Sequence, residues 1–173
     1  DRITEQLLQL ARFDAGQIVL NKTALHYSRL LQEACEDAEL LASAAKVSLD
    51  FDVQPDLRVV GDAHHLRRLF LNLLDNACKH NQPGGQVRCW LKQENGYARL
   101  RVANTGPGIP AEMRSRVFER FFRADPSRPN TRGHGLGLAL SWEIVDLHGG
   151  ELTLADASAP GWTEFEVRFP LAS

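Results

Sequence analysis

A two-residue turn between two predicted strands constrains the fold more strongly than any other local feature. The dipeptide Asn95-Gly96 separates residues 87–93 from residues 98–103. Asn and Gly both tolerate the positive φ angles that a two-residue hairpin turn requires. We therefore predict an antiparallel hairpin, and with it a fold that contains a β-sheet.

The remaining periodicity predicts helices on both sides of this hairpin. Apolar residues recur at helical spacing in residues 3–13, 28–45 and 63–80, and Asp62 is placed as the N-cap of the third of these helices. Two further helices are expected at residues 111–118 and 136–147. Further strands are expected at residues 18–20, 47–53, 57–60, 152–154 and 163–169. This order predicts a two-layer α/β sandwich, in which helices cover one face of a mixed, mostly antiparallel sheet.

Composition limits the class of protein. With 173 residues the chain fits one domain plus a short extension, and its net charge of −2 does not indicate a nucleic-acid surface. Three cysteines without a C-x-x-C pair fit a reducing compartment and a place in the core better than a disulfide framework. No apolar run approaches the ~20 residues of a membrane span, so we expect no membrane contact by this chain. Because it begins at Asp1 inside a helical pattern, we expect it to be a piece of a longer protein.

The helix predicted over residues 63–80 carries polar side chains next to an apolar stripe. Asn72, Asn76, Lys79 and His80 fall on one face, at positions i, i+4, i+7 and i+8. Amide oxygens suit Mg²⁺, a lysine ammonium suits phosphate, and an imidazole ring can stack on a base. The alternative is a solvated helix edge with two asparagines of no special role.

Two glycine-containing loops complete the candidate site. Residues 104–110 follow a strand directly, and their glycines allow the backbone to approach a ligand closely. In residues 133–140 the glycines alternate and then lead into a helix, whose first N–H groups form an anion site. Each loop alone is a weak signal, because a strand-end turn or a chance glycine repeat has the same appearance.

The order of the motifs is more specific than any one of them. Asn-x-x-x-Asn-x-x-Lys-His on a helix precedes Asn-Thr-Gly-Pro-Gly-Ile-Pro, then Phe-Glu-Arg-Phe-Phe-Arg at residues 118–123, then Gly-His-Gly-Leu-Gly-Leu-Ala-Leu. Over about residues 18–170 this series resembles the asparagine box, first glycine box, phenylalanine box and second glycine box of sensor histidine kinase catalytic domains. Residues 8–16 resemble the end of the second helix of that family's dimerisation domain.

The resemblance implies a Bergerat-type ATP-binding fold over residues 17–173, preceded by the end of a dimerisation helix and linker at residues 1–16. It implies ATP and Mg²⁺ as ligands, with Asn76 and Asn72 on the metal. The catalytic residues it implies are Asn72, Asn76, Lys79 and Arg123, and residues 124–132 would form a lid. The ATP-binding residues it implies are Asn72, Asn76, Lys79, His80, Asn104, Gly106, Gly108, Ile109, Arg123, Gly133, His134, Gly135, Leu136, Gly137 and Leu138.

One residue departs from the family pattern. Asn104 stands where the family most often has an Asp that accepts a hydrogen bond from the adenine amino group. An asparagine can accept through its oxygen, without charge assistance, or present its NH₂ group instead. Adenine selectivity is therefore open at this point. Together with residues 121–128, Asn104 resembles the heavy-metal-sensing branch of these kinases.

The activity implied is transfer of the ATP γ-phosphate to a histidine on a separate dimerisation domain. None of the six histidines here fits that acceptor motif, so we expect no autophosphorylation of this chain alone. The resemblance also implies a response regulator as partner, and a cytoplasmic domain of a protein anchored in the bacterial inner membrane. The alternatives are a degenerate nucleotide-binding adaptor without kinase activity and an anti-sigma-type serine kinase or gyrase-like ATPase of the same fold.

Overall fold

The computed structural model describes residues 2–124, 133–156 and 160–173. Its centre is a five-stranded sheet in the order β2-β4-β5-β7-β6. These strands span Ser48–Val53 (β2), Gln86–Glu94 (β4), Tyr97–Thr105 (β5), Glu151–Ala155 (β6) and Trp162–Pro170 (β7). Strand β2 runs parallel to β4, and the other three pairings are antiparallel.

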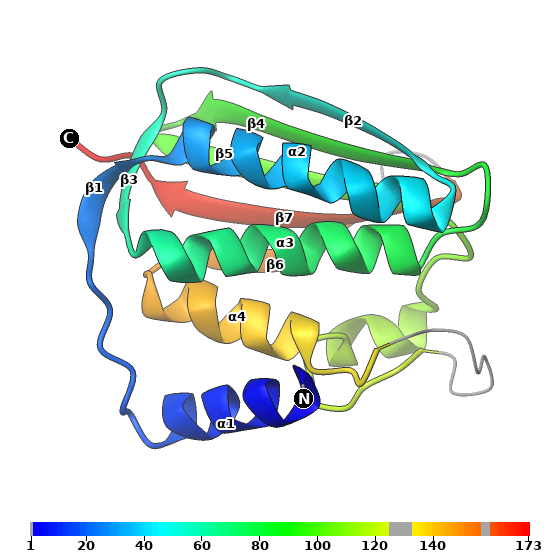
Figure 1. Cartoon of the computed structure of the whole chain (residues 1–173), viewed down its shortest axis with the longest axis horizontal. Coiled ribbons are helices and arrows are strands. Elements are labelled where there is room, and N and C mark those ends of the chain that lie inside the picture. Colours follow the sequence, from blue (N-terminus) through cyan, green and yellow to red (C-terminus); the bar gives the residue numbers. More distant parts are fainter. Residues whose placement is uncertain (1, 125–132, 157–159) are drawn as a thin grey trace.

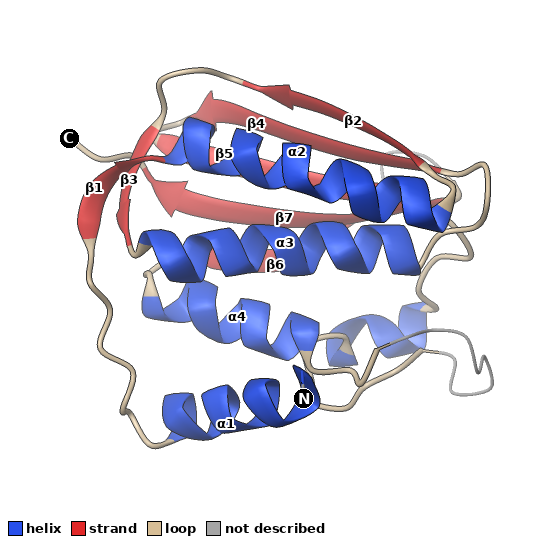
Figure 2. Cartoon of the chain, viewed as in Figure 1, coloured by secondary structure: helices blue, strands red, loops and turns tan. Residues whose placement is uncertain are grey.

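Three helices cover one face of this sheet (Figures 1 and 2). They are α2 (Tyr27–Ala45), α3 (Ala63–Lys79) and α4 (Gly137–Leu147). The core lies between the two layers, where the Tyr27 ring meets the edges of the Phe70 and Phe169 rings at centroid distances of 5.2 and 5.8 Å. The three cysteines are buried, as predicted for core residues. The two-layer α/β sandwich with a mixed sheet is confirmed.

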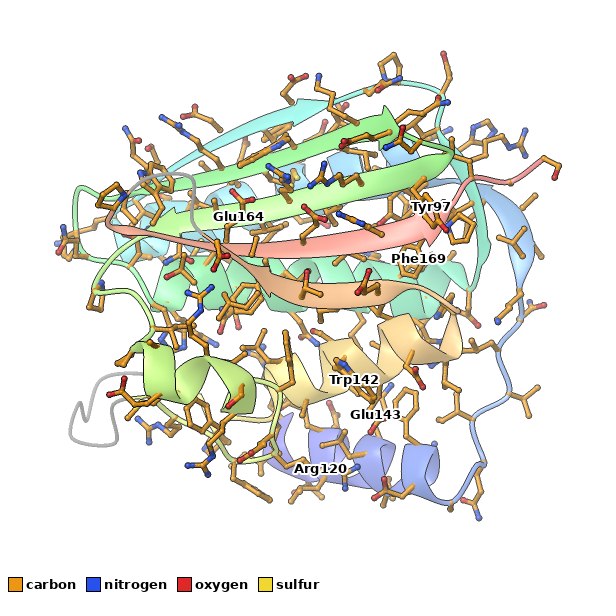
Figure 3. All side chains as sticks on the ribbon, turned by 180° about the vertical axis from the view of Figure 1, so that it is seen from behind. Tyr97, Arg120, Trp142, Glu143, Glu164 and Phe169 are labelled. Carbon is orange, nitrogen blue, oxygen red and sulfur yellow. The ribbon has the colours of Figure 1, made fainter. Side chains whose placement is uncertain are left out.

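The other face of the sheet carries charged side chains rather than helices (Figure 3). Glu166 on β7 accepts hydrogen bonds from Arg101 Nε at 2.9 Å and from Arg168 Nε at 2.6 Å. The pair with Arg101 links β5 to β7, the pair with Arg168 lies within β7, and together they satisfy a carboxylate that is largely covered by its neighbours. The sheet can therefore leave this face without a second layer of helices.

The predicted hairpin turn is present. Asn95 and Gly96 have φ angles of 52° and 84°, and the strands on either side pair from Val87 with Asn104 to Glu94 with Tyr97. The N-cap of α3 is also confirmed, because the Asp62 side chain accepts from the backbone N–H groups of His64 and His65.

One predicted strand was wrong. Residues 18–20 form no strand; the strand in this region is β1 (Thr23–His26), which pairs with β3 (Arg58–Gly61). Val19 is 90% exposed, so its apolar side chain has no sheet to pack against. The short helix predicted over residues 111–118 is present as a 3₁₀ helix, η1 (Ala111–Arg116), in which no residue is buried.

Helix α1 (Arg2–Asp14) lies against α4, on the side away from α3 (Figure 1). Leu10 is its anchor, with an exposed fraction of 1%. Helix α4 is apolar around most of its circumference, because one side faces the sheet and α1 covers part of the other. Among the described residues no helix is long and apolar enough to span a bilayer.

Candidate nucleotide-binding site

Helix α3 presents the asparagine box at a fixed rotation. Its apolar stripe faces the core, and this stripe consists of Leu66, Leu69, Phe70, Leu73 and Ala77. Asn72 and Asn76 lie beside the stripe and are half-buried. Since the stripe fixes the rotation of the helix, the two amides are held at the boundary between core and solvent, as predicted.

Asn72 carries an unsatisfied polar atom. Its Nδ2 is buried and has no hydrogen-bond partner within the described ranges 2–124, 133–156 and 160–173. A buried amide without a partner costs free energy, which a polar ligand can recover. A phosphate oxygen would satisfy the NH₂ group, whereas the flipped amide would offer its oxygen to a metal ion. The residue fits a magnesium nucleotide in either orientation.

Lys79 is already paired in this structure. Its Nζ donates to Asp75 Oδ2 at 2.5 Å, one helical turn earlier on α3. The same Asp75 oxygen accepts from Arg2 Nη2 at 3.0 Å, from the first turn of α1. The sequence analysis did not include Asp75, because a carboxylate between two asparagines of a helix is an ordinary surface residue by pattern.

The orientation of the Asn104 side chain is set by its neighbours. Asn104 is 2% exposed at the end of β5. Its Nδ2 donates to the His80 carbonyl oxygen at 3.2 Å and to the Thr105 carbonyl oxygen at 2.9 Å. Carbonyl oxygens can only accept, so both contacts require the NH₂ end here. The acceptor oxygen Oδ1 takes part in neither of these two contacts.

The first glycine box packs against the C-terminal end of α3. Gly106 has φ +147°, and a Cβ atom there would lie 2.6 Å from the His80 carbonyl oxygen. Glycine is thus required for the loop to reach His80. Gly108 has φ +76° and open space around it, and Ile109 is partly buried against the core.

A side-chain network that the sequence analysis missed ties this loop to α3. Thr105 Oγ1 donates to Asn81 Oδ1 at 2.9 Å, and Asn81 Nδ2 donates to the Gln86 carbonyl oxygen at 2.9 Å. The backbone N–H of Gln86 donates in turn to Thr105 Oγ1 at 2.8 Å. The asparagine box and the first glycine box are therefore one connected unit.

His80 follows α3 as its C-cap and is exposed. Neighbouring protein atoms partly remove the ring from water and lower its pKa below 6.5, and the positive charges of Lys79 and Arg123 lower it further. Asp75 opposes this shift. A neutral ring near pH 7 suits stacking on a base.

The second glycine box packs on the phenylalanine box. The Phe121 backbone N–H donates to the Gly135 carbonyl oxygen at 2.9 Å. Phe121 has φ +62° and Gly135 has φ +69°, and a Cβ on Gly135 would lie 2.6 Å from the Phe121 carbonyl carbon. Gly135 is thus required by the contact between the two boxes, whatever it does for a ligand.

Helix α4 begins without a capping side chain on its own N-cap residue. That residue is Leu136, which is 1% exposed and makes no side-chain hydrogen bond to the first turn. The N–H groups of the first turn, which includes Gly137 and Leu138, therefore point outward as a site for anions. Gly133 and His134 are exposed just before it, and residues 125–132 of the predicted lid lie outside the described residues.

The comparisons with known proteins agree with this geometry. Residues 61–173 match the family described as histidine kinase-, DNA gyrase B-, and HSP90-like ATPase. The probable sensor histidine kinase TcrY of Mycobacterium tuberculosis is 42% identical over 98% of this chain and 35% of its own length. CzcS of Cupriavidus metallidurans is 33% identical, also over 98% of this chain and 35% of its own length. The chain thus spans about a third of these curated relatives.

Solved structures show the same relationship. The mycobacterial sensor histidine kinase MprB has 36% identity and a TM-score of 0.74, covering 87% of this chain and 97% of that one. Full-length ShkA, in complex with AMPPNP, has 28% identity and a TM-score of 0.82, covering 97% of this chain and 35% of that one. The chain therefore belongs to the histidine kinase-, DNA gyrase B- and HSP90-like ATPase family, as a catalytic ATP-binding domain of the sensor histidine kinases.

Proposed function

We propose that this domain binds ATP with Mg²⁺ and transfers the γ-phosphate to a histidine on a dimerisation domain of the same kinase. The observation that carries the nucleotide assignment is the fixed amide of Asn104. Its oxygen is the only end of the side chain left for a ligand, and an adenine amino group is a donor of the matching kind. The ShkA structure, to which this chain is similar, holds AMPPNP.

We assign the base to the end of α3 and the first glycine box. Asn104 accepts from the adenine amino group, and the His80 ring packs on the base. Gly106 and Gly108 let the loop close on it, with Ile109 as an apolar contact from the core side. The connected network of Asn81, Thr105 and Gln86 supports this assignment, because it holds both walls of the base site in one arrangement.

We assign the phosphates to α3 and the start of α4. Lys79 and Arg123 contribute positive charge. The first turn of α4, which its N-cap residue Leu136 does not cap, contributes backbone N–H donors. The residues around it are Gly133, His134, Gly135, Leu136, Gly137 and Leu138. Asn76, with Asn72 beside it, holds the metal ion through amide oxygens. A bound Mg²⁺ would neutralise charge on the phosphates.

In the reaction, a nitrogen of the acceptor imidazole forms a bond to the γ-phosphorus while the bond from that phosphorus to the β–γ bridging oxygen breaks, and ADP leaves. The domain positions the γ-phosphoryl group and stabilises the charge that develops on it. Within the family, a response regulator then takes the phosphoryl group, and we propose the same partner here. From the same family relationship we propose that the domain works in the cytoplasm, as part of a kinase anchored in the inner membrane.

Labelling in trans tests this proposal. The chain is incubated with γ-labelled ATP and Mg²⁺, alone and together with the dimerisation domain of its kinase. We expect acid-labile label on the dimerisation domain and none on the chain alone. Acid-stable label on a serine would favour the anti-sigma-type alternative, and ATP binding without any label would favour the adaptor alternative. Acid-labile label on the chain alone would contradict the assignment of the acceptor.

A further inference from the structure

Asp75 pairs with two cationic side chains, one of which is Lys79. Its side chain is 14% exposed, and its Oδ2 accepts both from Lys79 Nζ at 2.5 Å and from Arg2 Nη2 at 3.0 Å. Lys79 belongs to the same helix as Asp75. Arg2 belongs to α1, which is 73 residues distant in sequence. One carboxylate oxygen thus joins a separate helix to the lysine of the asparagine box.

The net charge of the cluster around Asp75 depends on whether α1 is docked, because α1 carries Arg2. Asp75 and Lys79 alone form a neutral pair, in which the carboxylate competes with any phosphate for the ammonium group. With Arg2 in place, two cations share one carboxylate and the cluster carries a net positive charge. Coulombic attraction then favours an anionic ligand beside Lys79, and the partial burial of Asp75 reduces the screening of this effect.

Helix α1 is held at its other end as well. Asp14 accepts from Arg120 through both carboxylate oxygens, at 2.6 and 2.5 Å, and Arg120 also pairs with Glu143 of α4 at 3.5 Å. Figure 3 shows Arg120 and Glu143 on neighbouring elements beside α1. Together with the buried Leu10, these contacts fix the whole helix on the domain. The presence of Arg2 at Asp75 is therefore tied to the docking of α1 as a unit.

We propose that Asp75 is a positioning residue that couples the docking of α1 to the availability of Lys79 for nucleotide phosphate. When α1 is docked, Arg2 shares the Asp75 carboxylate with Lys79 and offsets its negative charge, so that Lys79 can turn from Asp75 to a phosphate at a lower cost in free energy. When α1 leaves, Asp75 retains Lys79 and the phosphate site loses positive charge. By linkage, ATP binding and α1 docking strengthen one another to the same degree. This inference rests on the proposed function, since it takes Lys79 as a phosphate ligand.

A double-mutant cycle tests the coupling, with ATP and AMP affinities measured by calorimetry in the presence of Mg²⁺. We expect Arg2→Gln to weaken ATP binding about two- to fivefold, as for a partly exposed ion pair. In the Asp75→Asn background the same change has no effect, because Arg2 then has no carboxylate to neutralise. AMP lacks the phosphates that Lys79 contacts, so its affinity stays constant. Arg2→Lys retains the charge and restores ATP binding.

The matched control is Arg12→Gln, which removes the same charge from the last turn of the same helix. We expect this variant to bind ATP as the unmodified chain does. Should Asp75→Asn not fold, Arg2→Glu replaces it, since Arg2 is a surface residue with 64% of its side chain exposed. The reversed charge leaves Lys79 more firmly held, so Arg2→Glu weakens ATP binding more than Arg2→Gln.

The outcomes separate this inference from the proposed function. ATP binding by the unmodified chain, with equal affinities for Arg2→Gln and Arg12→Gln, would overturn the coupling and leave the nucleotide site intact. An Arg2→Gln effect of the same size in the Asp75→Asn background would also overturn it. Absence of ATP binding by the unmodified chain would contradict the proposed function itself.

Discussion

The side-chain NH₂ of Asn104 donates to the carbonyl oxygen of His80 across 3.2 Å, and this contact joins the end of β5 to the end of α3. It fixes which end of the amide faces a ligand. The position that carries an Asp in most of the family therefore keeps an acceptor here, although it has no charge. We therefore predict that Asn104 accepts from an adenine amino group through Oδ1, without charge assistance.

Asn104→Ala is expected to reduce both ATP affinity and the preference for adenine. The variant removes the acceptor for the adenine amino group and leaves the His80 carbonyl oxygen without its donor. We expect ATP affinity to fall about tenfold, the size of a lost hydrogen bond at a buried site. GTP, which has no amino group at the same ring position, should lose far less. Competition binding with both nucleotides checks this, and an unchanged ratio of ATP to GTP affinity would contradict the role of Asn104.

Gly135→Ala is expected to destabilise the fold by about 1–3 kcal/mol, because it forces a side chain into a left-handed backbone conformation. Its Cβ would also lie 2.6 Å from backbone atoms of Phe121 and Phe122. The control is Gly137→Ala, at the start of α4, where a Cβ meets nothing within 4 Å. Urea unfolding of both variants separates a packing role from a general need for glycine. Equal stabilities of the two variants would contradict the contact between the second glycine box and the phenylalanine box.

The free energy of unfolding is expected to fall as the pH drops below 6.5, in part through His148. Its Nε2 accepts from the Asp62 backbone N–H at 3.0 Å, and its Nδ1 lies 2.7 Å from the Ile144 carbonyl oxygen. This pattern needs the neutral ring with its proton on Nδ1. Burial lowers the pKa of His148 below 6.5, and the nearby positive charge of Lys22 acts in the same direction. The folded state therefore binds fewer protons than the unfolded state.

Because the folded state binds fewer protons than the unfolded state, the free energy of unfolding falls as the pH falls. The stability that the neutral His148 contributes is fully present above pH 6.5 and is lost as the pH falls toward the lower pKa of the folded state. One proton gives a slope of at most about 1.4 kcal/mol per pH unit. His80 contributes in the same direction, so the comparison is with His148→Gln, which cannot titrate. Urea unfolding between pH 5 and 8 should give a shallower slope for that variant, and parallel slopes would contradict the assignment.

Asp62 does not contribute to the pH dependence of stability between pH 5 and 8. Burial acts to raise it, but hydrogen bonds from the Asn21 N–H and from His65 hold it at about 2. The stability that its ionised form contributes is present above pH 3.8 and is lost only as the pH falls toward 2. The slope measured between pH 5 and 8 therefore contains no contribution from Asp62.

Local chemistry explains which parts of the fold were predictable from sequence. The turn at Asn95-Gly96 and the cap at Asp62 depend on neighbouring residues only, and both were predicted correctly. The strand predicted at residues 18–20 was wrong because pairing depends on a distant partner, and Arg58–Gly61 pairs with residues 23–26 instead. The parallel pairing of β2 with β4 likewise joins segments that no local pattern relates.

The candidate site likewise has features that could be predicted from sequence and features that could not. The rotation of α3 follows from its apolar stripe, so the placement of Asn72 and Asn76 could be predicted. The orientation of the Asn104 amide, the contact of Gly135 with Phe121 and the pairing of Asp75 with Arg2 could not. Each of these joins elements far apart in the chain, and each depends on atoms whose relative positions only the folded structure defines.

Calorimetric titration of the chain with ATP, with and without Mg²⁺, tests the central claim most directly. The comparison is between the unmodified chain, Asn76→Ala and Asn21→Ala, which makes the same change at an exposed residue outside the site. We predict Mg²⁺-assisted ATP binding that Asn21→Ala retains and Asn76→Ala loses. ATP binding that is independent of Mg²⁺ and equal in all three proteins would contradict the assignment of Asn76, and with it the site built on α3.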